Sequence, residues 1–168
     1  MQNLITILLI LTIGGVHQKT RAQDMQEVNK NGMKVGWEII DDQLYVEMSA
    51  PTKGWVAIGF NTTSQLKGTS LLMGHVKGAN SEVVDFFVRA PGDYEPVTEL
   101  GGVSVITQSE GKEEGGATHI SFHIPLRPNS EFHQQLVVGE MYHLLMAFSL
   151  EDDFKHHSVM RTSTTIKL

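Results

Sequence analysis

Two adjacent histidines near the carboxyl end are the residues whose types and spacing suggest chemistry. His156 and His157 follow an acidic stretch and stand just before the last expected strand. A neutral imidazole nitrogen is a common metal ligand. The pair therefore predicts either a metal-ligating histidine or a polar loop in which one imidazole packs and the other is solvated.

Other polar side chains carry weaker signals. His119 and His123 lie four apart on an expected strand, where they share one face with Ser121. Since a strand rises about 3.3 Å per residue, these imidazoles are too far apart to ligate one compact ion, and the face they share is expected to meet solvent. Asp85 has no matched second carboxylate, so we expect it to cap a turn or a strand rather than to catalyse.

Sequence signatures of common enzymes are missing from the chain. There is no Gly-x-Ser-x-Gly elbow, phosphate-binding glycine loop, dinucleotide fingerprint or His-Glu-x-x-His helix. An all-β chain without a nucleophile and base pair favours binding or electron transfer over catalysis. We therefore predict a domain that is not itself an enzyme and whose redox activity, where present, is that of a bound cofactor.

The elements that must position these residues are strands. Apolar residues alternate with polar ones in Val35, Trp37 and Ile39, a period of two. Similar stretches, separated by Gly, Pro, Asn or Asp, recur along the chain and predict an all-β fold, an immunoglobulin-like antiparallel β-sandwich. The expected strands are 35–39, 44–48, 55–60, 71–76, 82–88, 103–109, 117–124, 142–149 and 158–168. Residues 130–137 are the one candidate helix, and 111–116 are expected to be a flexible connector.

Composition bounds the class of protein. The chain has 168 residues, a net charge of −6 and no basic run, which argues against a nucleic-acid partner.

Residues 1–22 are expected to be a signal peptide, because the apolar run at 4–16 is too short to span a bilayer and is followed by Ala22, after which cleavage is expected. Residues 23–168 would then form one exported domain, secreted or periplasmic, without a membrane span. Since the chain has no cysteine, disulfides and thiolate ligands are excluded.

Several segments, taken in order, resemble the DOMON family. The resemblance covers roughly Met33 to Leu168. It rests on five segments: Gly54 to Asn61, Gly68 to Val76, Val83 to Phe87, Ile120 to Leu126, and Leu145 to Phe148. Members of the family bind b-type haem or other small ligands within a β-sandwich, so the resemblance implies a ligand pocket between the two sheets.

The resemblance also implies which residues would hold haem. His157, followed by Ser158 and then by Arg161, is similar to the axial histidine of haem-binding members, with His156 as its competitor. The position similar to the family's axial methionine holds Leu66, which has no lone pair for iron. Met73 or His75 would then be the substitute ligand, or haem would be held by His157 alone.

Three hypotheses follow for the function. The first is a b-type haem domain for electron transfer or sensing, with a redox partner protein and His157 as the metal ligand. The second is a haem-free module for a sugar or other small molecule, with Trp55, Trp37 and Phe60 as an apolar platform. The third is a structural or protein-interaction domain.

Overall fold

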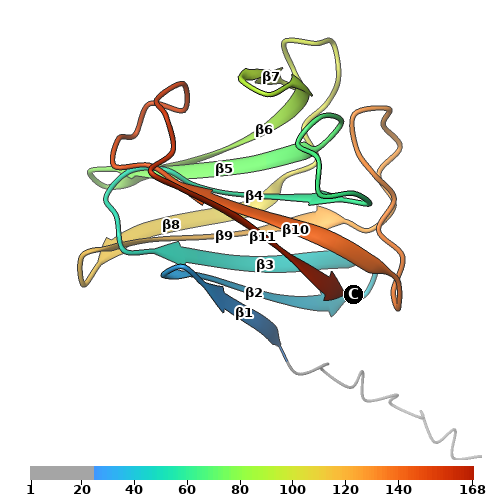
Figure 1. The fold of residues 1–168 in the computed structure, drawn as a ribbon, viewed down its shortest axis with the longest axis horizontal. Coiled ribbons are helices and arrows are strands. Elements are labelled where there is room, and N and C mark those ends of the chain that lie inside the picture. The colour runs from blue at the N-terminus through green and yellow to red at the C-terminus, as the bar shows by residue number, and fades with distance from the viewer. Residues whose placement is uncertain (1–24) are drawn as a thin grey trace, which may run out of the picture.

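The computed structural model describes residues 25–168, so the expected signal peptide lies outside the described residues. This part of the chain folds into eleven strands (Figure 1). The strands are β1 (Gln26–Lys30), β2 (Met33–Ile40), β3 (Gln43–Ala50), β4 (Val56–Asn61), β5 (Ser70–Lys77), β6 (Asn80–Ala90), β7 (Asp93–Pro96), β8 (Thr107–Glu114), β9 (Ala117–Pro125), β10 (Met141–Phe148) and β11 (Met160–Lys167). Residues 25–168 contain no helix long and apolar enough to cross a bilayer.

The strands form two antiparallel sheets, which confirms the predicted β-sandwich. The five-stranded sheet has the order β1-β2-β3-β9-β8, and the six-stranded sheet has the order β11-β10-β4-β5-β6-β7. Figure 1 shows β10 and β11 in front of the middle of the molecule, with β5, β6 and β7 above and β1, β2 and β3 below. Near the edge, the Lys30 ammonium of β1 donates to the Ser163 carbonyl of β11 at 2.7 Å and so links the two sheets.

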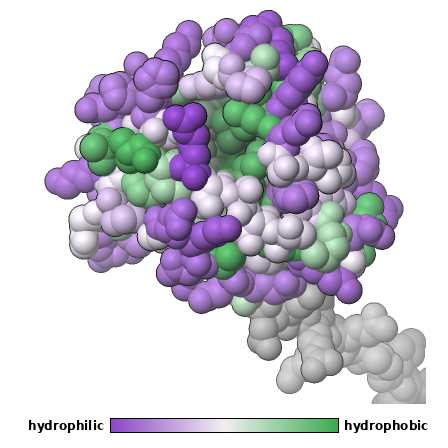
Figure 2. Space-filling model, in the orientation of Figure 1, coloured by the Kyte–Doolittle hydropathy of each residue, from purple (hydrophilic) through white to green (hydrophobic). Residues whose placement is uncertain are grey.

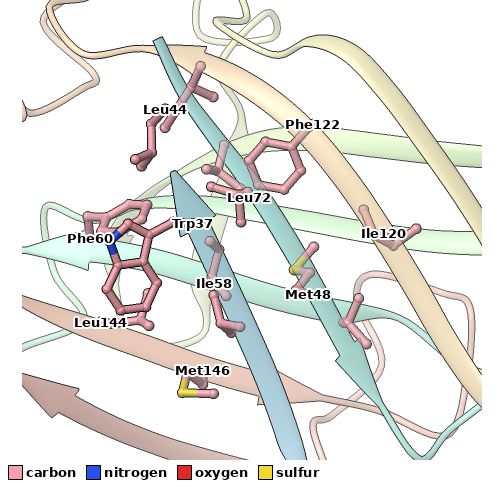
Figure 3. Close-up of a cluster of buried hydrophobic side chains, with 14 of the residues drawn as sticks. Trp37, Leu44, Met48, Ile58, Phe60, Leu72, Ile120, Phe122, Leu144 and Met146 are labelled. Carbon is pink, nitrogen blue, oxygen red and sulfur yellow. The ribbon is translucent and has the colours of Figure 1, made fainter. Parts of the chain in front are cut away.

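The main core fills the space between the sheets (Figure 3). The central strands contribute every second residue to it, as in β3 and β9, because side chains alternate between the two faces of a strand. The labelled core residues are Trp37, Leu44, Met48, Ile58, Phe60, Leu72, Ile120, Phe122, Leu144 and Met146. At Gly74 the sheets come so close that an added Cβ would lie 2.9 Å from Ile120, so this position has no room for a side chain.

Some expected elements differ from those observed. The expected strand 103–109 is wrong in its bounds, because Val103 is exposed and the strand runs from Thr107 to Glu114. The residues predicted as a connector, 111–116, therefore lie partly in β8, whose pairing with β9 orders a polar segment. Residues 130–137 form turns and irregular chain rather than a helix. The short edge strands β1 and β7 were not predicted.

Candidate ligand-binding site

A second apolar cluster lies on the outer face of the six-stranded sheet, away from the main core. Its buried members are Trp55, Ala57, Met73 and Phe86, and the partly buried residues Leu71, Val84, Tyr94, Ala147 and Phe154 pack against them. All the side chains from Trp55 to Phe60 are buried, because those on one face of the strand pack in the main core and those on the other face pack in this second cluster. Burying both faces explains why this strand has a continuous apolar sequence rather than an alternating one.

A cavity of about 560 Å³ opens on this outer face. Apolar residues line its interior, and its charged residues are Asp93, Glu95, Lys155 and Arg161, with His156 and His157 beside them. In Figure 2 a hollow with a hydrophobic interior and a largely hydrophilic rim opens towards the viewer, over the upper part of the view in Figure 1. Its volume is within the range of roughly 300–1,000 Å³ that is typical of small-ligand sites.

Small residues make the floor of the cavity. Arg161 of β11 is paired with Ala147 of β10, Ala147 with Ala57 of β4, and Ala57 with Met73 of β5. Directly paired residues in a sheet face the same side, so these four side chains form one row across the outer face. Strands lie about 4.8 Å apart, which places the two ends of the row, Arg161 and Met73, roughly 14 Å from each other. The two alanines between them leave room for a ligand.

The loop that carries both histidines, residues 149–159, is held firmly against the sheet. The Trp55 amide donates to the Glu151 carbonyl at 3.0 Å, and the Ser149 amide donates to the Trp55 carbonyl at 2.9 Å. The Ser149 hydroxyl donates to the His157 carbonyl at 3.0 Å, which fixes the backbone between the two imidazoles and β11. Phe154 packs edge-on against Phe86, with ring centroids 5.6 Å apart. The loop therefore forms a defined wall of the cavity.

Tyr94 of β7 fastens the same loop from the other side. Its hydroxyl donates to the Phe154 carbonyl at 2.5 Å, and its ring packs edge-on against Phe86 with centroids 5.4 Å apart. Burial, with a smaller contribution from the nearby Asp153 carboxylate, raises the pKa of Tyr94 above its ordinary value. Sequence reasoning missed this residue, because β7 is short and its contact with residue 154 bridges sixty positions.

A second loop, residues 62–69, carries Leu66 to the cavity. Its conformation depends on Asn61 at the end of β4, whose amide donates to the Gln65 carbonyl and to the Thr69 hydroxyl, each at 2.8 Å. The Gln134 amide donates to the Asn61 side-chain oxygen at 3.1 Å. Asn61 is buried and is thus a structural residue that sets the position of Leu66.

The structure gathers four of the predicted site residues at this cavity. Trp55, Met73, His156 and His157 all line it, although they come from the residue before β4, from β5 and from the loop before β11. The cavity lies outside the sandwich, so the expectation of a pocket between the sheets is corrected. Both imidazoles are exposed. The side-chain bonds that histidines form within residues 25–168 belong to His75 and His133, so His156 and His157 keep their ring nitrogens free of protein partners.

Three predicted site residues lie elsewhere. Phe60 points into the main core, as does Trp37. His75 faces outward on β5 but is covered by Phe154, with ring centroids 4.8 Å apart. Its Nε2 lies 3.1 Å from the Glu82 carboxylate and its Nδ1 lies 3.7 Å from the Asp152 carboxylate. His75 therefore supports the 149–159 loop from below and does not line the cavity.

Asp85 is a structural acid at the mouth of the main core. Its carboxylate accepts hydrogen bonds from the Ser70 hydroxyl at 3.2 Å and from the Val105 amide at 3.2 Å. The His133 Nε2 lies 2.6 Å from the same carboxylate, and the His133 Nδ1 lies 2.7 Å from the Ser130 hydroxyl. These bonds tie the segments around residues 105 and 133 to β5 and β6, which agrees with the expected capping role.

The described residues offer little else that resembles a site. A polar groove of about 380 Å³ crosses the outer face of the five-stranded sheet, with His119, Glu47 and Glu110 among its lining residues. His123 packs on Tyr45, with ring centroids 4.8 Å apart. Both histidines lie on the outward face that was expected of them. Within residues 25–168 no three histidine, aspartate or glutamate side chains are grouped closely enough to hold a metal ion.

Two solved structures share this fold. One is the cytochrome b domain of pyranose dehydrogenase from Coprinopsis cinerea, with a TM-score of 0.64, 9% identity, and coverage of 85% of this chain and 81% of that one. Another is the cytochrome domain of Myriococcum thermophilum cellobiose dehydrogenase, with a TM-score of 0.62, 9% identity, and coverage of 86% and 81%. At this identity the likeness concerns the fold alone.

Sequence comparison identifies the family. A curated relative, MOXD1 homolog 2 of Drosophila melanogaster, is 25% identical over 119 residues, which are 71% of this chain and 15% of that protein. The chain thus corresponds to a small part of that relative. The family model described as the DOMON domain matches residues 29–149, from the first strand pair to the end of β10. The chain belongs to the DOMON family.

Proposed function

We propose that this domain binds an apolar small molecule in the outer cavity and that this ligand is, most specifically, b-type haem. His157 would be the iron ligand, with His156 as the alternative. The observation that carries the proposal is a cavity of about 560 Å³ with a floor of Ala57 and Ala147 and two partner-free imidazoles in its wall. The likeness to cytochrome b domains supports the same assignment by analogy of fold.

The donor set of the cavity fits haem held through one imidazole. Leu66 lines the cavity but offers no electron pair, and Met73 is buried in the same apolar cluster as Trp55 and Phe86. The exposed histidines are the donors that are free to reach an iron atom. Bound haem would supply one-electron transfer or gas binding, while the protein would set burial and axial ligation. We propose further that the domain works outside the cytoplasm with a redox partner, after removal of residues 1–22.

Leu66 also supports a second candidate function. An apolar residue in the wall at this point suits a haem-free ligand that is held by burial rather than by coordination. The Trp55 ring would then contact an aromatic ligand or a sugar. Its indole N–H would be free to donate a hydrogen bond to that ligand, because it is buried and has no partner within residues 25–168.

Haemin titration of the purified domain tests the first proposal. We expect a Soret band to develop at one haemin per chain and to shift on reduction. His157→Ala should remove the shift and lower affinity at least about tenfold, since an axial ligand is lost. His156→Ala serves as the matched neighbour, and His123→Ala on the other sheet as the distant control.

A gain of ligation makes the same test sharper. Leu66→Met introduces a thioether at the cavity wall and should convert the spectrum to that of six-coordinate haem. If haemin binds equally to wild type, His156→Ala and His157→Ala with unchanged spectra, axial ligation by the loop is wrong. If haemin does not bind to the folded protein, the haem-free function stands.

A further inference from the structure

We propose that the cavity selects amphipathic anions: ligands with an apolar body and at least one acidic group, which Arg161 and Lys155 bind at the rim. This inference rests on the proposed ligand site but not on haem as its occupant. Its basis is the uneven distribution of charge around the cavity. A net charge of −6 for the whole chain makes a basic rim unexpected.

The basic wall has no internal partners. Lys155 and Arg161 line the cavity and are exposed, together with His156 and His157. The ion pairs that lysine and arginine form within residues 25–168 involve Lys34, Arg89 and Lys112. The guanidinium of Arg161 therefore keeps its donors free, and a planar guanidinium matches a carboxylate in two parallel hydrogen bonds.

The acids of the cavity are already neutralised or turned away. Arg89 lies 2.6 Å from the Asp93 carboxylate and 3.9 Å from that of Glu95, so the acidic wall carries its own cation. In the loop itself, the Asp152 carboxylate faces His75 at 3.7 Å, and the Asp153 carboxylate accepts a hydrogen bond from the Lys155 amide at 2.9 Å. Neither loop aspartate lines the cavity.

Geometry sets the order of the two parts of the ligand. Arg161 stands at one end of the row that continues through Ala147 and Ala57 to Met73. An apolar body that lies on the alanines, with its far end at Met73 and Trp55, would bring its acidic end to the guanidinium. The interaction is formed at a partly apolar site, where a charge-assisted hydrogen bond is stronger than on an open surface.

A matched pair of fluorescent probes tests this selection without haem. The probes are 8-anilinonaphthalene-1-sulfonate and the neutral N-phenyl-1-naphthylamine, which share a body and differ by the acidic group. We expect the sulfonate to bind about tenfold more tightly at low salt, and the difference to narrow as ionic strength rises. Arg161→Gln should reduce this preference at least about threefold while leaving the neutral probe unchanged, and Arg161→Lys should restore part of it.

Controls locate the effect. Arg127→Gln removes an exposed arginine outside the cavity and should change neither probe. Ala147→Leu should weaken both probes, which shows that they occupy the cavity. Equal affinities of the two probes, a preference unchanged in Arg161→Gln, or no binding of either probe would overturn the inference. Metal-free protoporphyrin IX and its dimethyl ester then distinguish a porphyrin from other amphipathic anions. If haemin does not bind while the preference for the anionic probe is observed, only the haem proposal is refuted.

Discussion

Tyr45 is a side chain whose pKa is raised by its surroundings. Burial, followed by the hydrogen bond that its hydroxyl donates to the Glu47 carboxylate at 2.6 Å, raises the pKa of Tyr45 from 10.0 to about 12. A pKa that is higher in the folded than in the unfolded chain favours the neutral phenol in the fold. The resulting contribution to stability is complete below pH 10.0 and is lost as the pH rises from 10.0 to about 12.

Alkaline titration of phenolate absorbance checks this assignment. The chain has three tyrosines, so each contributes a resolvable share of the signal. Tyr45→Phe should remove the phenol that ionises near pH 12. Tyr94→Phe is the matched variant, because the pKa of Tyr94 is raised by burial too. An unchanged high-pH phase in Tyr45→Phe would contradict the assignment.

Some residues of the candidate site could be predicted from the sequence, but the residues that they contact could not. His156 and His157 were predicted to be either a metal-ligating histidine or part of a polar loop, and both line the cavity. The contacts of His75, His133 and Tyr94 could not be predicted. Each joins segments far apart in the chain, and such contacts depend on how the loops pack over the sheets.

The loop 149–159 packs closely against Gly54 and Trp55, the two residues that lead into β4. Gly54 is the point of closest approach, since an added Cβ would lie 2.4 Å from the Glu151 nitrogen and 2.5 Å from the Leu150 carbonyl carbon. This contact gives a physical reason for glycine at the start of the segment Gly54 to Asn61. It also makes the wall of the cavity sensitive to a single methyl group.

Gly54→Ala should therefore displace the loop. We expect a loss of about 1–3 kcal/mol in the free energy of unfolding, as for overpacking in general, and weaker binding of any cavity ligand. Urea denaturation measures the first effect and probe fluorescence the second. Gly78→Asn is a suitable control, because Gly78 has a φ of +65°, which asparagine tolerates, and open space around it. A Gly54→Ala protein with wild-type stability and binding would show that the loop is not held in this way.

Elements were predictable from sequence where a strand buries one face, and less so at the edges of the sheets. The strand β9 alternates apolar and polar residues and was expected almost in full. In contrast, β8 has the sequence of a polar loop, because it is an edge strand that is almost entirely exposed. Its pairing with β9 rather than its own composition makes it a strand.

In the molecule as a whole, the six-stranded sheet has a different environment on each face. The inner face of the six-stranded sheet contributes to the main core, and the outer face carries the cavity. The β-sandwich was predictable because alternating apolar residues in the sequence indicate which side chains face the main core. The place of the cavity was not, because the segment 55–60 is apolar on both faces and its sequence does not say which face meets the other sheet.

Two substitutions on β10 test this separation. Leu144 is fully buried in the main core, so Leu144→Ala should lower the free energy of unfolding by about 2–5 kcal/mol through lost burial and the cavity left behind. Provided the protein remains folded at the assay temperature, its affinity for a cavity ligand should stay close to that of wild type. Ala147, three residues on, faces the other side and is half-buried in the cavity floor.

Ala147→Leu should show the reverse pattern, with stability within about 1 kcal/mol of wild type and affinity reduced at least about tenfold. The reason is that the larger isobutyl side chain of leucine occupies the space between Arg161 and Met73. Urea unfolding and probe titration of both variants give a two-by-two comparison. A loss of binding in Leu144→Ala as large as that in Ala147→Leu would mean that the two faces of the sheet are energetically coupled. Independent losses would show that the cavity on the outer face and the core on the inner face contribute separately to binding and to stability, since distant sites without shared partners contribute additively.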